Sequence, residues 1–339
     1  MKAIGYFDPH PLHPLDSIAS SGEPQLELLE LPRPQLRPGD LLVDVRAVSV
    51  NPVDTKVRRS RAGVRPDQPV VLGWDAAGVV VEVGSEAHGF AVGDRVFYAG
   101  DITRAGSDAE LQAIDHRIVA RMPESLDFAA AAALPLTSIT AWEALFEKLR
   151  VPRGEASDVL VVGGAGGVGA IAVQLLRRFT PARVHATAGR PESRAFLTEL
   201  GVTSIVDRHG PLGADDSYDF VFATTGTADH WAKYPKILRP FGALCLIDDA
   251  GALDVSPFKL KSLSVCWELM FTKSRFGWKP ETQGEILRLV ARSVDEGLLR
   301  STATTRLEGF SVASFVEAHR VLESGTAVGK IVVVREVAP

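Results

Sequence analysis

The sequence contains very few cysteines. Only Cys245 and Cys266 occur among the 339 residues, and each lies in an apolar segment that is typical of a strand. Two such cysteines cannot form a Cys-x-x-Cys metal or redox site, and they do not make the disulfide framework of a small secreted domain. We therefore interpret both as reduced thiols in a protein core.

Long basic runs and long apolar runs are also absent. The net charge is −5 and the lysines and arginines are scattered, which argues against a general nucleic-acid-binding protein. No stretch approaches the roughly 18 uninterrupted apolar residues that indicate a membrane-spanning helix. The first residues are soon followed by Asp8, Pro9 and Pro11, so the long apolar core of a signal peptide is missing. We expect a cytoplasmic protein that binds neither nucleic acid nor membrane.

The first 127 residues read as short strands separated by turns. Residues 41–50 alternate between apolar and polar side chains, with Asp44 and Arg46 on the polar face. Two further strands are predicted at 78–84 and 95–98, each next to glycine. Short strands with frequent turn signals favour a small barrel or sandwich.

From about residue 128 the pattern changes to strands that alternate with helices. An alanine-rich helical entry leads to predicted strands at 159–162, 183–188, 204–206, 219–223 and 243–247, with helices at 168–179, 192–200 and 229–238 and a possible edge strand at 263–271. Such alternation predicts a doubly wound parallel sheet. At about 150 residues per domain, the length also predicts two domains.

One glycine-rich stretch follows the first strand of this second part. The strand 159–162 is wholly apolar, and the sequence then forms G-x-G-x-x-G before a helical pattern; the residues are Gly163, Gly164, Ala165, Gly166, Gly167, Val168 and Gly169. Glycines allow a tight turn and a close approach to pyrophosphate, and the helix start attracts its charge. The strand–turn–helix context predicts a dinucleotide site rather than an ordinary glycine-rich loop.

The end of the next strand indicates which dinucleotide binds. NAD-binding proteins place an acidic residue there to hold the ribose 2′-hydroxyl. Here Thr187 is followed by Ala188, Gly189 and Arg190, and no acid is present. A guanidinium can pair with a 2′-phosphate, so Arg190 and, one turn later, Arg194 favour NADPH. The alternative is that both arginines are solvated residues at the start of a helix.

Several stretches along most of the chain resemble the medium-chain dehydrogenase/reductase superfamily, and within it the zinc-free, quinone oxidoreductase-like branch often named zinc-type alcohol dehydrogenase-like. The stretches that carry the resemblance are Ala47–Lys56, Val71–Gly78, Val96–Thr103, Leu134–Trp142, the glycine turn and Val328–Val332. The resemblance implies an α/β protein with a discontinuous GroES-like β-barrel catalytic domain, residues 1–127 and 276–339, and a Rossmann NADPH-binding domain, residues 128–275. It also implies a cofactor cleft between the two domains.

The name of this branch suggests zinc, so the ligand positions matter. Where zinc alcohol dehydrogenases of the superfamily carry Cys, His and Glu ligands, this chain has Asn51, Trp74 and Asp75. Trp cannot ligate zinc, and Asn is a poor zinc ligand. His10 and His13 stand in a proline-rich loop without a cysteine nearby, and we interpret them as loop histidines. We therefore expect no metal site.

Without a metal to stabilise an alkoxide, reduction of a conjugated carbonyl is easier than oxidation of an alcohol. We expect hydride transfer from NADPH to quinones or α,β-unsaturated carbonyls, with Asn51, Tyr98 and Asp75 as candidate catalytic residues. Lys56 stands near where relatives often carry a tyrosine, which leaves water as an alternative proton source. By resemblance, Thr140 and Lys330 join the glycine turn, Thr187 and Arg190 in binding the cofactor.

Two other functions stay open on the sequence alone, a zinc-type alcohol dehydrogenase and a non-catalytic NADPH-binding protein. Trp267, Phe271, Phe276 and Trp278 suggest a bulky apolar ligand, or else core or interface positions. An exposed apolar edge strand tends to be covered. We therefore expect a homodimer in which residues 263–271 pair with their symmetry mate, as relatives in this family commonly do.

Overall fold

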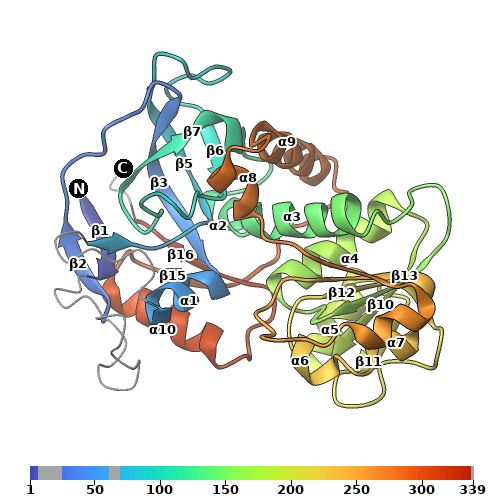
Figure 1. Ribbon diagram of the computed structural model, residues 1–339. Coiled ribbons are helices and arrows are strands. Elements are labelled where there is room, and N and C mark those ends of the chain that lie inside the picture. Colours follow the sequence, from blue (N-terminus) through green and yellow to red (C-terminus); the bar gives the residue numbers. More distant parts are fainter. Residues whose placement is uncertain (7–24, 61–68, 337–339) are drawn as a thin grey trace. The chain divides into compact units, whose positions relative to one another are not determined.

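The computed structural model describes residues 1–6, 25–60 and 69–336 (Figure 1). His10 and His13 lie outside these residues. The chain forms two compact units. Unit 1 comprises Met1–Leu136, Phe271–Asp295 and Ala303–Pro339, and unit 2 comprises Thr137–Met270 and Glu296–Thr302. The first unit is discontinuous, as expected, but its boundaries differ from those predicted at residues 127 and 276.

The first boundary lies later in the chain because α2 (Phe128–Ala132) belongs to unit 1. The alanine-rich sequence of α2 allows close packing, and this helix contacts strands β3, β5 and β16 of that unit. The side chain of Asp127 caps α2 by accepting a hydrogen bond from the Ala130 N–H at 2.7 Å. The alanine run therefore completes the barrel core, and the change in sequence texture precedes the change of unit.

Unit 1 is built on a seven-stranded sheet (Figure 1). Its order is β15 (Ala303–Glu308), β16 (Lys330–Val334), β3 (Asp40–Val50), β5 (Ala76–Val83), β6 (Arg95–Tyr98) and β8 (Val119–Arg121), and β7 (Leu111–Asp115) also pairs with β3. A smaller sheet contains β1 (Lys2–Tyr6), β2 (Glu27–Glu30) and β4 (Val70–Val71). Helices of this unit are α1 (Pro52–Ser60), α2, α8 (Phe271–Phe276), α9 (Glu281–Asp295) and α10 (Val312–Glu323), with the 3₁₀ turn η1 (His116–Ile118).

The three strands predicted in this region are confirmed as β3, β5 and β6. In β3 the predicted polar face is present, because Asp44 and Arg46 are its only partly exposed residues. Their side chains form an ion pair at 2.8 Å. All other residues of β3 are buried, since β5, β7 and β16 all pair with it. The C-terminal strand β16 thus completes the barrel, as the resemblance implied.

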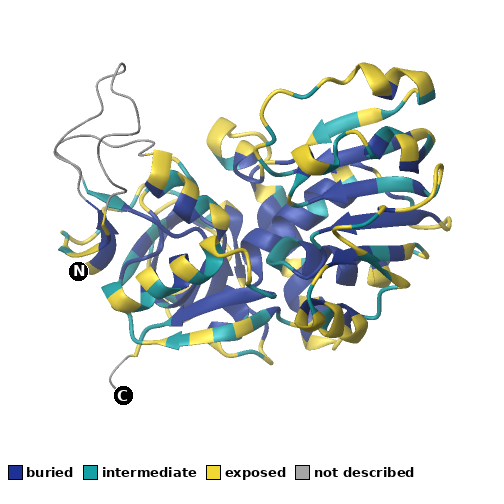
Figure 2. Ribbon diagram, turned by 90° about the horizontal axis from the view of Figure 1, so that it is seen from below, coloured by how far each residue is buried: buried dark blue, intermediate teal, exposed yellow. Residues whose placement is uncertain are grey.

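Unit 2 contains a six-stranded sheet in which every pairing is parallel. The order is β11 (Ser204–Asp207), β10 (Arg183–Ala188), β9 (Asp158–Val162), β12 (Tyr218–Ala223), β13 (Leu238–Leu246) and β14 (Ser264–Trp267). The central strand β9 is buried throughout, and Figure 2 shows the buried interior of the sheet in dark blue. The predicted doubly wound parallel sheet is confirmed, with β14 as its edge strand.

The helices of unit 2 are mostly those predicted from the sequence. They are α4 (Gly167–Phe179), α5 (Pro191–Leu200), α6 (Thr227–His230) and α7 (Tyr234–Ile237), with the 3₁₀ segment η3 (Ser256–Lys261). The single helix predicted at 229–238 was wrong, because the structure divides it into α6 and α7. Strand β13 then begins at Leu238, and Phe241 adopts a left-handed φ of 66° within it.

Within the described residues, one helical run is long and apolar enough to cross a membrane by length and composition. It joins α2, α3 (Pro135–Trp142) and the π-helical turn η2 (Glu143–Lys148), spanning Phe128–Lys148. Within its most apolar window, 83% of the residues are buried inside the protein. Core packing therefore accounts for its apolar character. Cytoplasmic location stays a prediction.

Candidate functional site

The glycine turn connects β9 to the start of α4 in unit 2 (Figure 1). Gly163 has a left-handed φ of 80°, a conformation that favours glycine. A Cβ atom on Gly164 would lie 2.6 Å from the Cβ of Ala186, and one on Gly169 would lie 2.3 Å from the carbonyl oxygen of Gly163. The predicted turn therefore requires glycine for close backbone packing.

Two threonines hold this turn in place. The Gly163 N–H donates a hydrogen bond to the Thr187 hydroxyl at 2.8 Å, which links the turn to the end of β10. The Thr224 hydroxyl donates to the Val162 carbonyl at 2.8 Å, which links it to the end of β12. The helix α4 has no side-chain cap at its N-terminus. This end of α4 thus has the shape and polarity that a pyrophosphate needs.

Basic side chains gather where β10 and β11 end. Arg190 follows β10 and is partly exposed, as the cofactor prediction requires. Arg208 and His209 were missed, and they lie against Gly189, because a Cβ atom there would be 2.9 Å from Arg208 Cδ and 3.2 Å from His209 Nε2. The signal was available in the strand order, since β10 and β11 are parallel neighbours whose carboxyl ends meet at one edge.

In unit 1, a buried network surrounds Asn51. The ammonium of Lys330 donates to the Asn51 side-chain oxygen at 2.5 Å and to the Val50 carbonyl at 2.8 Å. It also lies 3.3 Å from the Asp75 carboxylate, to which the Asn51 amide donates at 3.1 Å. All three side chains are at most 4% exposed. The predicted residues Asn51, Asp75 and Lys330 therefore form one hydrogen-bonded cluster.

Further buried carboxyls extend this network. The Asp54 carboxylate accepts a hydrogen bond from the Asn51 N–H at 2.5 Å. Burial raises the pKa of Asp54 to about 7 and the pKa of Asp75 to about 6. Burial and the charge of Asp54 also raise the pKa of Asp108, and burial lowers the pKa of Lys330. Because Asp54 and Asp75 titrate near neutral pH, the network can take up or release protons there.

Tyr98 differs from the other predicted catalytic residues. Its side chain is completely buried, and within the described chain its hydroxyl has no hydrogen-bond partner. Burial raises the pKa of Tyr98 above its usual value. Its phenol therefore keeps its proton at neutral pH. Within residues 1–6, 25–60 and 69–336, the Tyr98 hydroxyl forms no hydrogen bond with Asn51 or Asp75. Thr140, a predicted cofactor residue, lies buried in α3 of unit 2.

The residues at the expected zinc positions do not fit zinc. A lysine ammonium already bonds the Asn51 oxygen and neighbours the Asp75 carboxylate. Trp74, at the third position, is buried and packs edge-on against Phe271, with ring centroids 5.9 Å apart. Over the described part of the chain, no three His, Cys, Asp or Glu side chains come close enough together to hold a metal.

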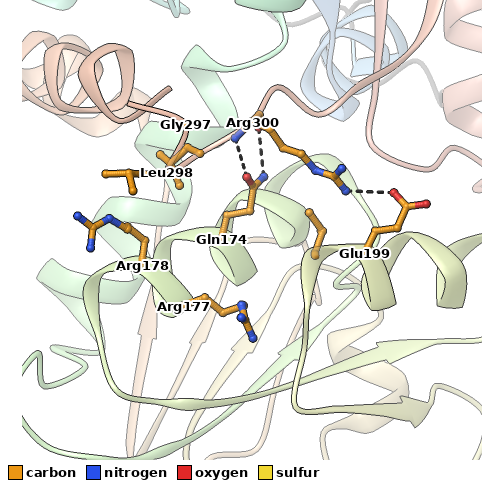
Figure 3. Close-up of a pocket in the computed structure, with 9 residues that line it drawn as sticks. Gln174, Arg177, Arg178, Glu199, Gly297, Leu298 and Arg300 are labelled. Carbon is orange, nitrogen blue, oxygen red and sulfur yellow. Dashed lines mark hydrogen bonds and ion pairs between the residues drawn. The ribbon is translucent and has the colours of Figure 1, made fainter. Parts of the chain in front are cut away.

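A separate pocket of about 320 Å³ lies at the other end of α4 (Figure 3). Gln174 and Arg300 line the pocket, and the Gln174 side-chain oxygen accepts a hydrogen bond from the Arg300 N–H at 2.8 Å. Arg300 also pairs with Glu199 at 3.2 Å. The pocket lies at the C-terminal end of α4 and includes no residue of the glycine turn. It therefore does not belong to the predicted cofactor site.

The chain is similar to known proteins along most of its length. Two family models match the chain, an alcohol dehydrogenase GroES-like domain over residues 37–124 and a zinc-binding dehydrogenase over residues 200–333. A zinc-type alcohol dehydrogenase-like protein of Staphylococcus aureus is 32% identical, over 98% of this chain and 99% of its own. An NADPH-dependent alkenal/one oxidoreductase of Arabidopsis thaliana is 29% identical, over 88% of this chain and 73% of its own.

Many solved structures resemble the chain over nearly its whole length, and two of them illustrate the family. One, from Rhizobium etli, has a name that assigns it provisionally to the zinc-dependent alcohol dehydrogenases; it is 45% identical with a TM-score of 0.89, over 100% of this chain and 99% of its own. The quinone oxidoreductase of Coxiella burnetii is 27% identical with a TM-score of 0.80, over 99% of both chains. The chain therefore belongs to the medium-chain dehydrogenase/reductase superfamily of oxidoreductases, together with the zinc-type alcohol dehydrogenase-like proteins and the quinone oxidoreductases.

Proposed function

We propose that this protein is an NADPH-dependent, zinc-independent reductase of quinones or α,β-unsaturated carbonyls. The observation that carries the proposal is the Lys330 ammonium bonded to Asn51 and lying 3.3 Å from Asp75. These two residues stand at expected zinc-ligand positions. A buried organic cation already balances the charge there, so alcohol oxidation would lack the Lewis acid that stabilises an alkoxide. Reduction of a conjugated acceptor needs no such metal.

The cofactor part of the proposal rests on unit 2. The glycine turn from Gly163 to Gly169 would hold the pyrophosphate, and Thr187 fixes that turn. Arg190, with Arg208 beside Gly189, would pair with a 2′-phosphate. The NADPH-dependent relative from Arabidopsis supports this choice of cofactor. When bound, the nicotinamide supplies a hydride, and the carbonyl oxygen of a conjugated substrate accepts the developing charge.

The second part of the reaction is proton delivery. Reduction of an enone or quinone by hydride leaves a basic oxygen or carbon that must gain a proton. In unit 1, Asp75 has a pKa of about 6 and hydrogen-bonds to Asn51. We assign the role of proton reservoir to this network in preference to Tyr98, whose buried phenol keeps its proton. Water remains the alternative final donor.

The substrate class is supported by the named activities of relatives. The Arabidopsis protein is an alkenal/one oxidoreductase and the Coxiella protein is a quinone oxidoreductase. Both substrates have a carbonyl conjugated to a carbon–carbon double bond, so both accept hydride with the charge delocalised onto oxygen. The two competing functions are a zinc-type alcohol dehydrogenase and a non-catalytic NADPH-binding protein.

A single set of assays separates the three functions. The purified chain is assayed with a panel of quinones and enones, each with NADPH and with NADH, and its zinc content is measured by elemental analysis. We expect turnover with NADPH, no stoichiometric zinc and no effect of chelators. One zinc per chain with alcohol oxidation would identify an alcohol dehydrogenase. NADPH binding without turnover of any acceptor would identify a non-catalytic protein.

Two glycine variants provide the matched control. Gly164→Ala places a Cβ 2.6 Å from Ala186 and should abolish turnover by displacing the turn. Gly154→Ala adds the same methyl group in a loop where nothing lies within 4 Å. It should leave turnover unchanged.

A further inference from the structure

The only two cysteines of the chain lie side by side in unit 2. Strands β13 and β14 pair in parallel, and Cys245 and Cys266 are direct partners in their register. Neighbouring strands lie about 4.8 Å apart, which falls within the Cα separations of roughly 4.4–6.8 Å that a disulfide bridges. The backbone therefore already holds the two residues at disulfide distance.

The two thiols also point to the same face of the sheet. Leu244, Leu246 and Val265 pack into the core cluster on one face. Because side chains alternate along a strand, Cys245 and Cys266 project from the other face, where η2 contacts both strands. Each sulfur is close enough to hydrogen-bond to the other, and Cys266 also donates to the Leu244 carbonyl at 3.4 Å. Neither cysteine is in a disulfide in this structure.

The two cysteines differ in exposure and in charge. Cys245 is fully buried, whereas Cys266 is half-buried on the edge strand and meets solvent first. The hydrogen bond from Cys245 lowers the pKa of Cys266, and the nearby charge of Lys148 lowers it further. Beside this pair, the carboxyl group of Glu268 interacts with those of Glu143 and Glu147. Burial raises the pKa of Glu268 to about 9, so it is neutral at pH 7 and does not oppose a thiolate.

We propose that Cys266 and Cys245 form a redox site, in which Cys266 reacts with a peroxide and Cys245 resolves the product into an intrachain disulfide. The site is independent of the proposed reductase activity, because it uses none of the cofactor or network residues. Its bond would tie the edge strand β14 to β13.

The chemistry balances with hydrogen peroxide as the two-electron oxidant. The Cys266 thiolate attacks one peroxide oxygen, so that a sulfur–oxygen bond forms, the oxygen–oxygen bond breaks and hydroxide leaves. The Cys245 sulfur then attacks the Cys266 sulfur, which forms the disulfide and breaks the sulfur–oxygen bond. The Cys245 proton leaves with the departing hydroxide as water. Two thiols and one peroxide thus give one disulfide and two waters.

The test treats the purified full-length chain with hydrogen peroxide and measures its intact mass and free thiols after denaturation. We expect each chain to lose the mass of two hydrogen atoms and both thiols, and dithiothreitol to restore them. Peptide mapping without reduction should recover one peptide pair joined through Cys245 and Cys266. Mass gain by oxygen atoms alone, or a link between two chains, would overturn the proposal.

Three variants assign the roles. In Cys245→Ser, Cys266 should collect oxygen atoms, because no resolving thiol remains. In Cys266→Ser, Cys245 should stay reduced under the same exposure, and oxidation as fast as in the wild type would contradict the assignment of Cys266 as the reacting thiol. Lys148→Met should slow the first step severalfold, whereas Lys56→Met, an exposed lysine in the other unit, should not.

Discussion

The ammonium of Lys330 lies 2.5 Å from the side-chain oxygen of Asn51, although 279 positions separate them in the chain. Strand register explains the contact. Ile331 of β16 pairs with Val50 at the end of β3, so the residue before Ile331 faces the residue after Val50. A lysine at the start of the last strand therefore reaches the first residue beyond β3. The result is a buried cation among the carboxyls of unit 1.

The first prediction concerns this cation. In Lys330→Met, the buried Asp75 and Asp54 carboxyls lose the positive charge that favours their ionised forms. Breaking a buried ion pair by removing one partner costs about 3–5 kcal/mol, and we expect a loss of free energy of unfolding of that order at pH 8. Urea denaturation measures it.

The matched control for this variant is Lys2→Met, because Lys2 is exposed on β1 of the same unit. It should change the free energy of unfolding by no more than about 0.5 kcal/mol, as surface substitutions usually do. If Lys330→Met were as stable as Lys2→Met, the buried ammonium would contribute nothing to the network.

The second prediction concerns pH. The pKa of Asp54 is raised from 3.8 to about 7 in the folded chain. Between these values the unfolded chain has released a proton that the folded chain retains, so the stabilisation from Asp54 is complete below pH 3.8 and is lost as the pH rises to about 7. Asp54→Asn cannot ionise and keeps an oxygen that can accept from the Asn51 N–H. Between pH 3.8 and about 7, the free energy of unfolding of Asp54→Asn should rise relative to that of the wild type by about 1.4 kcal/mol for each pH unit.

Urea denaturation of both proteins from pH 4 to pH 8 tests this sign. Other groups titrate in the same range, including the buried His319, whose pKa is lowered to about 4. His319 and other groups that do not interact with Asp54 are common to both proteins and cancel in the difference, whereas Asp75, Asp108 and Lys330 lose the charge of Asp54 and contribute to it. A difference that does not change with pH would mean that Asp54 is already ionised in the folded chain at acid pH.

The third prediction concerns cofactor choice. Arg190→Ala and Arg208→Ala should each weaken NADPH binding by about 1–3 kcal/mol, the range for charge-assisted hydrogen bonds. NADH lacks the 2′-phosphate, so its affinity should not change. Fluorescence titration of both cofactors gives the two dissociation constants. Lys259→Ala, which removes an exposed cation of η3 in the same unit, serves as control, and Arg194→Ala tests whether the phosphate contact extends along α5.

Equal affinity of the wild type for NADPH and NADH would show that our interpretation of the end of β10 is wrong. Loss of NADPH affinity in Arg194→Ala, with Arg208→Ala unaffected, would instead move the phosphate contact from the end of β11 onto helix α5.

The sequence predicted the local features that a short window can carry. Local patterns were enough to predict the backbone of β9 from its apolar run, the turn from its glycines and β3 from its alternation. Asn51, Asp75 and Lys330 were each singled out, but their cluster depends on the pairing of β16 with β3, which no local pattern shows. Arg208 was missed for the same reason, because its place beside Gly189 comes from the order of parallel strands. The split between α6 and α7 was missed although Pro235 stands in that segment.

The last prediction concerns assembly, which we infer from the edge of the unit 2 sheet. Strand β14 is the terminal strand, and apolar side chains near it are exposed, with Trp267 54%, Leu269 55% and Leu260 90% accessible. An edge strand presents unpaired N–H and C=O groups that can pair with another strand. We expect a homodimer in which β14 pairs antiparallel with its symmetry mate and two sheets become one.

The hydrogen-bond direction along β14 supplies a sharp test. The Glu268 N–H donates inward to the Leu246 carbonyl at 3.0 Å. Because successive N–H groups alternate in direction along a strand, the N–H of Trp267 points to the open edge. Trp267→Pro removes that donor and leaves the inward ladder to β13 intact, whereas Trp267→Thr removes the same aromatic ring and keeps the donor. Light scattering at micromolar concentration should show a dimer for the wild type and Trp267→Thr, and a monomer for Trp267→Pro. A monomeric wild type would reject the dimer, and a dimeric Trp267→Pro would place the interface on another surface.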